Sequence, residues 1–217
     1  YASILWKDYE HGLPGFLRNL GPAGLNKTSS DCNERSEGGT HMPLSTPVNS
    51  GKIWWSGDNP GILLKENEEG PWSALALFFR IVFTPAGRGN ALFLYENPNA
   101  EESLPNVHNV VLHDNEKMAH WLADNFIGAL PGPFSESPAF KELQYIPLTE
   151  CYTSGDTSSR YKQTVKAEGI EVDLIWDQLG TPTALELSPE HVGTRSHNLF
   201  NLLIESRDAS IVVNGRK

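Results

Sequence analysis

Arg80 is the residue whose surroundings most directly suggest a binding function. It stands inside the apolar run of residues 77–83, where burying a guanidinium without a partner is strongly destabilising. Its charge must therefore reach water or meet a carboxylate. Two interpretations stay open: Arg80 faces solvent from an edge of the sheet, or it points into the fold and holds an anionic group of a ligand. The second makes Arg80 a candidate ligand-binding residue.

Two polar residues interrupt an apolar face later in the chain. If residues 198–205 form a strand, Asn201 and Glu205 share a face with Leu199 and Leu203, because side chains alternate along a strand. On an inward face, Asn201 would bind a ligand and Glu205 would act as a catalytic acid or base. On a solvent face, both side chains would simply be hydrated.

Glu171 and Asp173 share a face of one expected strand, with their Cα atoms about 7 Å apart. Carboxylates at such a spacing can divide the roles of acid and base, so Asp173 is a candidate catalytic residue. The partner strand carries Arg160, Lys162 and Lys166. These cations favour a simpler interpretation, in which the charges form a solvated ladder.

The histidines add two catalytic candidates, His113 and His197, because histidine titrates near neutral pH. Each could equally be an ordinary surface or half-buried side chain. No pair among the seven histidines has the spacing of a metal site on one element. The two cysteines, Cys32 and Cys151, fit no metal-ligand pattern. We expect no metal and leave open whether the cysteines form a disulfide.

Tryptophan is frequent, with six in 217 residues. Trp54 and Trp55 precede a group of turn residues, and Trp176 ends an expected strand. Rings at such positions can stack on sugars or on flat organic ligands, which makes these three tryptophans candidate ligand-binding residues. Packing in the core is the other role open to them.

The common signatures of nucleotide, zinc and α/β-hydrolase enzymes are absent. The sequence contains no Gly-x-Ser-x-Gly, Gly-x-Gly-x-x-Gly, His-Glu-x-x-His or Cys-x-x-Cys motif and no phosphate loop. We also expect no parallel strand–helix–strand unit of the kind that supports nucleotide binding. We therefore expect no cofactor, and any catalysis would be acid–base chemistry of the isomerase, lyase or hydrolase type.

Charge and hydropathy limit the partners. The formal net charge is −10 and the basic residues are scattered, so phosphate backbones and anionic lipid surfaces would be repelled. The longest apolar run, residues 74–83, is shorter than the roughly 18 residues that a membrane-spanning helix needs. We expect a soluble protein, cytoplasmic or secreted, that binds neither nucleic acid nor membranes.

The first 51 residues are expected to form an irregular arm and linker (1–51) ahead of a single β-rich domain (52–217). Apolar residues within 1–24 favour a short helix or an apolar clip, and residues 25–51 are rich in Ser, Thr, Asn, Gly and Pro. The arm would pack on the core of its own chain or on a second copy. The second arrangement would make the protein a homo-oligomer.

Short strands separated by turn residues follow. The pattern favours a hairpin of 52–55 and 62–65 around the turn residues 57–61, followed by strands 73–83, 91–96 and 109–112. Residues 73–83 could also begin as a helix capped by Ser73, but their second half favours a strand. One prominent helix is expected over about 115–129, because its apolar residues recur at helical spacing. Asp114 would be its N-cap.

The rest of the chain is expected to be β, with strands 142–149, 160–167, 170–176, 183–187, 198–205 and 210–213. Residues 160–167 and 170–176 should pair as a hairpin. If Ala167 lies opposite Ile170, then Lys166 faces Glu171 and Lys162 lies opposite residue 175, as on a hydrated sheet face.

These elements predict a mainly β (β-rich α+β) fold: a curled antiparallel sheet, barrel or sandwich with one helix and an irregular N-terminal arm. Three functions stay open. The chain could be a β-barrel-like domain that binds a small organic molecule and catalyses acid–base chemistry on it. It could be a carbohydrate-binding module that uses exposed tryptophans. It could also be a structural domain that assembles through the arm.

Overall fold

The computed structural model describes residues 2–7, 55–67, 69–102, 104–128, 132–156, 158–191 and 198–217, and for residues 2–7 and 200 it describes the backbone only. Trp54, His197 and Cys32 lie outside this description, as does most of the expected arm. Cys151 is fully buried and disulfide-bonded.

Strands dominate the described residues. They are β1 (Ala2–Lys7), β2 (Ser56–Asp58), β3 (Gly61–Lys65), β4 (Trp72–Phe83), β5 (Gly89–Tyr95), β6 (Asn109–His113), β7 (Gln144–Gly155), β8 (Arg160–Ala167), β9 (Ile170–Leu179), β10 (Thr183–Leu187) and β11 (Leu199–Val213). The helical segments are the α-helix α1 (Glu116–Leu122), the π-helical η2 (Ala123–Ile127) and the 3₁₀ helices η3 (Pro138–Glu142) and η4 (Pro189–His191).

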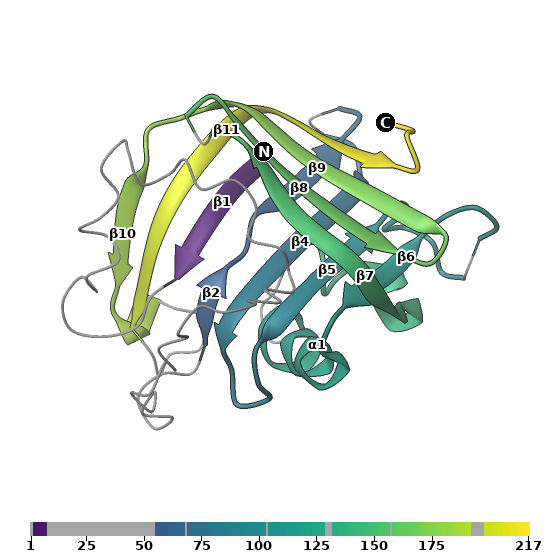
Figure 1. Ribbon diagram of the computed structural model, residues 1–217, viewed down its shortest axis with the longest axis horizontal. Helices are drawn as coiled ribbons and strands as arrows, with labels where there is room; N and C mark the ends of the chain where they lie inside the picture. The colour runs from purple at the N-terminus through teal and green to yellow at the C-terminus, as the bar shows by residue number, and fades with distance from the viewer. Residues whose placement is uncertain are drawn as a thin grey trace, which may run out of the picture.

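All these strands belong to one sheet, with neighbours in the order β10-β11-β9-β8-β7-β6-β5-β4-β2-β1-β3. The sheet curls strongly, so that β7, β8 and β9 form one layer in front of β4, β5 and β6 (Figure 1). The expected fold class is confirmed: the chain is mainly β, with a curled, mostly antiparallel sheet and one prominent helix.

The first strand corrects the expectation for the start of the arm. Ala2–Lys7 is neither a helix nor an irregular clip but the strand β1, which pairs antiparallel with β11 on one side and with β2 and β3 on the other. Hydrogen-bond partners from distant parts of the chain therefore decide the conformation of this short segment, and local pattern did not reveal them.

Strands β2 and β3 do not form the expected hairpin. Both pair antiparallel with β4 in one register, with Asp58 opposite Arg80 and Gly61 opposite Leu77. Together they form one extended segment along β4. The segment is interrupted near Pro60, because proline has no N–H to contribute to the hydrogen bonds between strands. The apparent turn thus keeps Asp58 beside Arg80 of β4.

Strands β6 and β7 pair in parallel, and α1, η2 and η3 lie between them in the chain. This strand–helix–strand unit was not expected from the sequence. The helix itself is confirmed, but its N-cap is Asn115, whose side chain accepts a bond from the backbone N of Met118 at 3.1 Å. Asp114 instead accepts bonds from the backbone and side chain of Asn90.

The later strands follow the sequence prediction closely. Strands β8 and β9 pair with Ala167 opposite Ile170 and Lys166 opposite Glu171, the predicted register. The expected strands 198–205 and 210–213 are parts of the one long strand β11.

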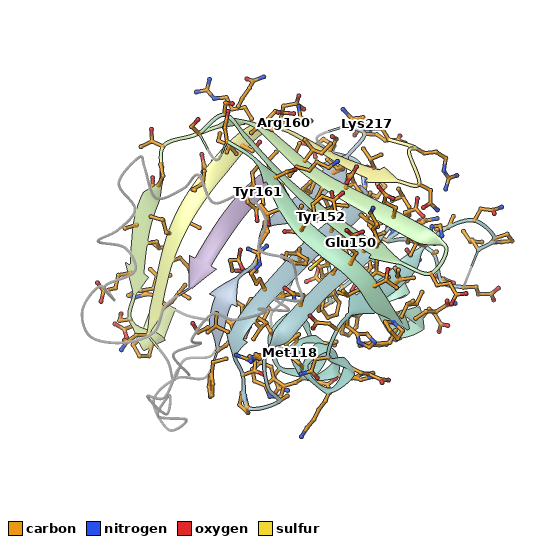
Figure 2. The ribbon with its side chains drawn as sticks, viewed as in Figure 1. Met118, Glu150, Tyr152, Arg160, Tyr161 and Lys217 are labelled. Carbon is orange, nitrogen blue, oxygen red and sulfur yellow. The ribbon has the colours of Figure 1, made fainter. Side chains whose placement is uncertain are left out.

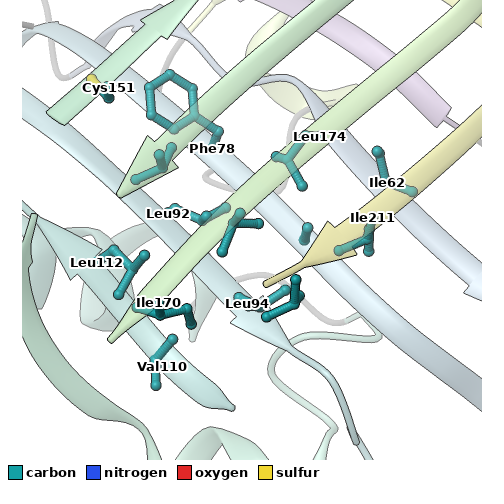
Figure 3. Close-up of a cluster of buried hydrophobic side chains, with 14 of the residues drawn as sticks. Ile62, Phe78, Leu92, Leu94, Val110, Leu112, Cys151, Ile170, Leu174 and Ile211 are labelled. Carbon is teal, nitrogen blue, oxygen red and sulfur yellow. The ribbon is translucent and has the colours of Figure 1, made fainter. Parts of the chain in front are cut away.

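Two hydrophobic clusters lie on opposite faces of the curled sheet. The inner cluster fills the space between the layers with side chains such as Phe78, Leu92, Leu174 and Ile211 (Figure 3). The outer cluster lies between β4, β5, β6 and the helix, where Met118 of α1 is buried (Figure 2). Because side chains alternate along β4, each face of this strand serves a different cluster.

None of the helices in the described part of the chain is long and apolar enough to span a membrane.

Candidate functional site: a polar cluster around Arg80

The inner face of β4 becomes progressively more exposed towards one end of the sheet. Phe78 is 0% exposed, the side chain of Arg80 is 33% exposed, and Val82 is 57% exposed. These residues alternate along one strand and so share one face. The apolar interior therefore ends at Arg80, and the curled sheet opens to solvent beyond it.

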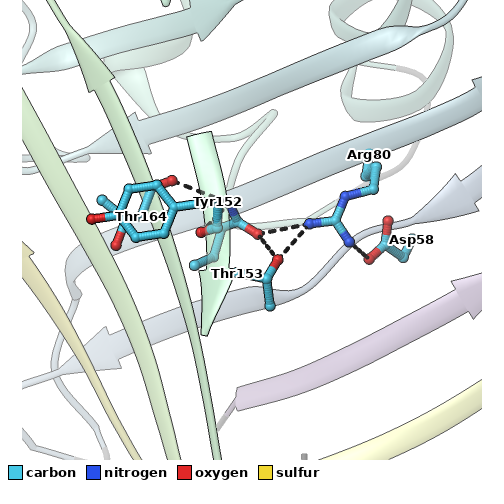
Figure 4. Close-up of polar contacts among 6 residues, drawn as sticks. Asp58, Arg80, Tyr152, Thr153 and Thr164 are labelled. Carbon is cyan, nitrogen blue, oxygen red and sulfur yellow. Dashed lines mark hydrogen bonds and ion pairs between the residues drawn. The ribbon is translucent and has the colours of Figure 1, made fainter. Parts of the chain in front are cut away.

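Arg80 points into the fold and meets polar groups from three strands (Figure 4). Its Nη1 donates to Asp58 Oδ2 at 3.1 Å, and its Nη2 donates to Thr153 Oγ1 at 2.7 Å and to Gln163 Oε1 at 2.9 Å. Asp58 lies on β2, Thr153 on β7 and Gln163 on β8. The cluster thus joins the two layers of the sheet, and Asp58 is the carboxylate that a buried Arg80 requires.

Gln163 gives the cluster a fixed orientation. Its side chain is completely buried, and its Nε2 donates to the backbone oxygens of Tyr152 and Thr164 at 3.0 and 3.1 Å. The Thr153 hydroxyl donates to the same Oε1 that Arg80 contacts. With these bonds in place, the acceptors around the guanidinium are held in fixed positions.

Tyr161 adds a buried hydroxyl beside Arg80 and Thr153. Its side chain is 6% exposed and its ring lies 5.4 Å from the ring of Trp176. Burial raises the pKa of Tyr161, whereas the charge of Arg80 and the interactions of the hydroxyl with Thr153 and Arg80 oppose this rise. Tyr161 therefore belongs to the polar cluster, although its hydroxyl forms no hydrogen bond of good geometry.

The strand register places further residues in the same row. Leu202 lies opposite Trp6, Trp6 opposite Asp58, Asp58 opposite Arg80, and Arg80 opposite Asn90. Residues directly opposite one another share a sheet face, so Asp58, Arg80 and Asn90 belong to the inner face. Asn90 Oδ1 is also buried without a partner among the described residues.

Burial and the mutual attraction of Asp58 and Arg80 shift the pKa of each residue in opposite directions. Burial raises the pKa of Asp58, which is only 3% exposed, and the Arg80 charge opposes this rise. Burial lowers the pKa of Arg80, but Asp58 and Tyr161 together raise it above its usual value. The guanidinium therefore stays charged, next to a carboxyl whose ionisation depends on it.

His113 lies on the outer face, away from this cluster. It ends β6 opposite Ala91, which in turn lies opposite Phe79 of the outer cluster. Its ring centroid is 6.1 Å from that of Tyr145, and the ring of His120 stacks on the Tyr145 ring at a centroid distance of 3.9 Å. Burial lowers the pKa of His113, while Glu116 opposes this effect.

Asp173 lies in a ladder of charges on the outer face of β8 and β9. Its carboxylate accepts a bond from Thr164 at 2.6 Å and pairs with Lys162 at 2.8 Å. Lys166 pairs with Glu171 and with Glu150 of β7. Glu150 is labelled on this strand in Figure 2. The structure thus contains the charge ladder that the sequence offered as the simpler interpretation.

Asn201 and Glu205 also face away from Arg80. Asn201 lies opposite Lys7, Lys7 opposite Gly57 and Gly57 opposite Ile81, which is the register row of the outer face. Asn201 is buried there, whereas Glu205 is exposed. The structure does not bring these two residues to the Arg80 cluster.

The described tryptophan candidates are buried. Trp55 is 1% exposed and stacks on Phe126 at 5.4 Å, and Trp176 is fully buried with its Nε1 donating to the Gly61 oxygen at 3.2 Å. Neither ring is available at a surface where a sugar could stack on it. The carbohydrate-binding hypothesis thus has no support from these two rings.

The main residues around Arg80 escaped the sequence analysis. Asp58 was hidden in a group of turn residues. Gln163 and Tyr161 had a usable signal, since they alternate with the charged residues 160, 162 and 166 and share a face with Val165. Strand alternation alone could therefore have placed a glutamine on an apolar face.

Among the described residues, no group of His, Cys, Asp and Glu side chains has the arrangement of a metal site. No protein-family model matches this chain, and neither a curated protein nor a solved structure matches it.

Proposed function

We propose that the protein binds a small organic molecule at the open end of its curled sheet, where the exposed part of the Arg80 guanidinium provides the polar contact and the neighbouring Tyr161 hydroxyl helps to position it. The observation that carries this proposal is the Arg80 guanidinium, which is held by Asp58, Thr153 and Gln163 while its side chain stays 33% exposed. Binding sites combine a few fixed polar groups with apolar walls. An oxygen atom of a ligand would accept a hydrogen bond from the exposed part of this guanidinium.

An apolar side chain next to this position would contact the rest of the ligand. Val82 is exposed on the same strand face as Arg80, two residues further along β4. A ligand with a polar head and a short apolar body matches this combination.

Binding alone is proposed, without a reaction. Of the acid–base candidates that the structure describes, His113, Asp173 and Glu205 all lie on the outer face or in exposed positions. Their catalytic roles stay predictions. Asp58 is the titratable carboxyl nearest to the proposed ligand, and its Oδ2 is engaged by Arg80.

Ligand-observed NMR with a set of small amides, alcohols, carboxylates and methyl glycosides tests the proposal. Compounds that show a binding effect with the native chain should show a weaker effect or none with Tyr161→Phe and Arg80→Gln. The matched control is Arg160→Gln, because Arg160 pairs with Asp177 on the outer face at 3.5 Å. This variant should bind as the native chain does.

Tyr161→Phe also separates binding from stability. Because the Tyr161 hydroxyl forms no hydrogen bond of good geometry, its removal should change the melting temperature little, while binding is weakened. If no compound binds the native chain, or if bound compounds are unaffected by both Tyr161→Phe and Arg80→Gln, the proposed function is wrong.

A further inference from the structure

We infer that Cys151 forms its disulfide with Cys32 of the same chain and that the protein acquires this bond in an oxidising compartment. Neither point depends on the proposed function, because no ligand is involved. Both points were open in the sequence, which did not decide whether the two cysteines are paired or whether the protein is cytoplasmic or secreted.

The position of Cys151 identifies its partner. Cys151 is disulfide-bonded and 0% exposed, and it lies in the inner cluster opposite Val165 of β8 (Figure 3). A disulfide requires Cα atoms within about 7 Å of each other, so a second protein molecule would have to insert its backbone into this core. The sequence contains one other cysteine, Cys32. The bond therefore joins Cys151 to Cys32 within one chain.

The bond closes a large ring of the chain. A link between residues 32 and 151 encloses β2, β3, β4, β5, β6 and the first part of β7. Such a link restricts the unfolded chain and stabilises the folded one, more for longer loops. Cys151 also shares a face of β7 with Thr153, which accepts a bond from Arg80. The disulfide thus stabilises β7 next to the residue that it supplies to the Arg80 cluster.

Formation of this bond is an oxidation. Each thiol loses one hydrogen, and the two electrons and two protons pass to an oxidant such as a small-molecule disulfide, which becomes two thiols. Cytosolic disulfides are mostly transient catalytic or redox-sensing bonds, and these roles require an accessible sulfur. The enclosed sulfur of Cys151 does not meet that requirement, which leaves a structural disulfide of an oxidising compartment.

Thiol counting on the full chain, exported to a bacterial periplasm, tests the pairing. Iodoacetamide should modify no cysteine in the unfolded, unreduced chain and both cysteines after reduction with dithiothreitol. A protease digest without reduction should contain one cross-linked peptide that includes residues 32 and 151. Free thiols in the unreduced chain, or a disulfide-linked dimer on a non-reducing gel, would overturn the inference.

Melting temperatures show whether the fold depends on the bond. Reduction of the native chain should lower its melting temperature by at least about 5 °C. Cys151→Ala and Cys32→Ala should each melt at a lower temperature than the native chain and should not respond to dithiothreitol. The double variant should melt close to Cys151→Ala, because both changes remove the same bond.

Val165→Ala is the matched control, because it removes a buried side chain opposite Cys151 and keeps the disulfide. It should melt at a lower temperature than the native chain and still respond to dithiothreitol. If dithiothreitol shifts the cysteine variants as much as the native chain, the bond is not the cause and the inference is wrong. If a cysteine variant does not fold, the thiol count and the reduction of the native chain decide.

Production of the full chain in the bacterial cytosol tests the compartment. The cytosolic product should carry two free thiols and melt at the temperature of the reduced chain, whereas the periplasmic product should carry none. A cytosolic product with two free thiols that is as stable as the periplasmic product would show that the fold does not need an oxidising compartment. That result would overturn the second part of the inference.

Discussion

Arg80 and His113 lie in adjacent rows of the same sheet but on opposite faces. Burial lowers the pKa of both residues, but only Arg80 has partners that outweigh this effect. Arg80 meets Asp58, Thr153 and Gln163 inside the curl, and its pKa is raised, so it keeps its charge. His113 is buried under the outer cluster, no described residue hydrogen-bonds to its ring, and its pKa is lowered. The comparison teaches that burial favours the uncharged form of a cationic group, whereas fixed partners of opposite charge favour the charged form.

Arg80→Met should break this comparison most severely. It leaves Asp58 buried without its cation, and breaking a buried pair in this way costs roughly 3–5 kcal/mol of unfolding free energy. The lower end applies, because Arg80 is partly exposed. Urea denaturation measures the loss of unfolding free energy. A loss below about 1 kcal/mol, as for an exposed ion pair, would contradict the interpretation that Asp58 depends on Arg80.

The pH dependence of Arg80→Met provides a control with a definite sign. Burial raises the pKa of Asp58 and Arg80 opposes this, so in the variant the folded carboxyl binds a proton more tightly than the unfolded one. Its stability relative to the native chain should therefore recover as the pH falls.

Gln163→Leu should have the next largest effect. The substitution removes one acceptor of Arg80 and the side-chain donor that contacts two backbone oxygens. Thr153 still accepts from Arg80, so we expect a loss of about 1–3 kcal/mol, the range for unsatisfied buried polar groups. A gain in stability on denaturation would show that the network is less important than its apolar surroundings.

His113→Phe sharpens the other side of the comparison. The pKa of His113 in the folded state lies below its unfolded value of about 6.5, so the unfolded chain binds the proton more tightly. The native chain should lose stability as the pH falls from about 7 to about 5, and the variant should lose less. Denaturation midpoints at both pH values measure the difference, with His191→Gln, an exposed position, as the control that keeps the native slope.

Lys162→Met should have the smallest effect. Lys162 pairs with Asp173 at 2.8 Å on the outer face, and Asp173 keeps its bond from Thr164 when the lysine is removed. Such pairs contribute below about 1 kcal/mol, and high salt should reduce the effect further. A loss as large as that of Arg80→Met would mean that the inner and outer charge pairs do not differ in the way described.

Local pattern was sufficient for some elements and misleading for others. The hairpin of β8 and β9 was predicted to the residue because alternation and a two-residue turn fix its register. The hairpin predicted across residues 57–61 was wrong, because turn-forming residue types also occur at a break within a strand. The parallel pairing of β6 with β7 was missed for a similar reason, since no local signal marks which strand a crossover returns to.

The candidate site shows the same division. That Arg80 must find a carboxylate or water followed from its apolar neighbours, but the identity of the carboxylate did not. Of the other candidates described, Asp173, Glu205 and Asn201 were placed on plausible strands, yet their faces depend on strand pairing. Core packing was one of the two roles left open for Trp55 and Trp176, and both side chains are buried in the core.

The sequence by itself determined the β-rich class, the position of the helix and the alternation that puts Arg80 on one face of its strand, because each depends on residues a few positions apart. Only the tertiary structure decided which groups meet Arg80, since Asp58, Thr153 and Gln163 lie 22, 73 and 83 residues away in the chain. Contacts at such separations follow from how the sheet curls, and no local pattern encodes that geometry.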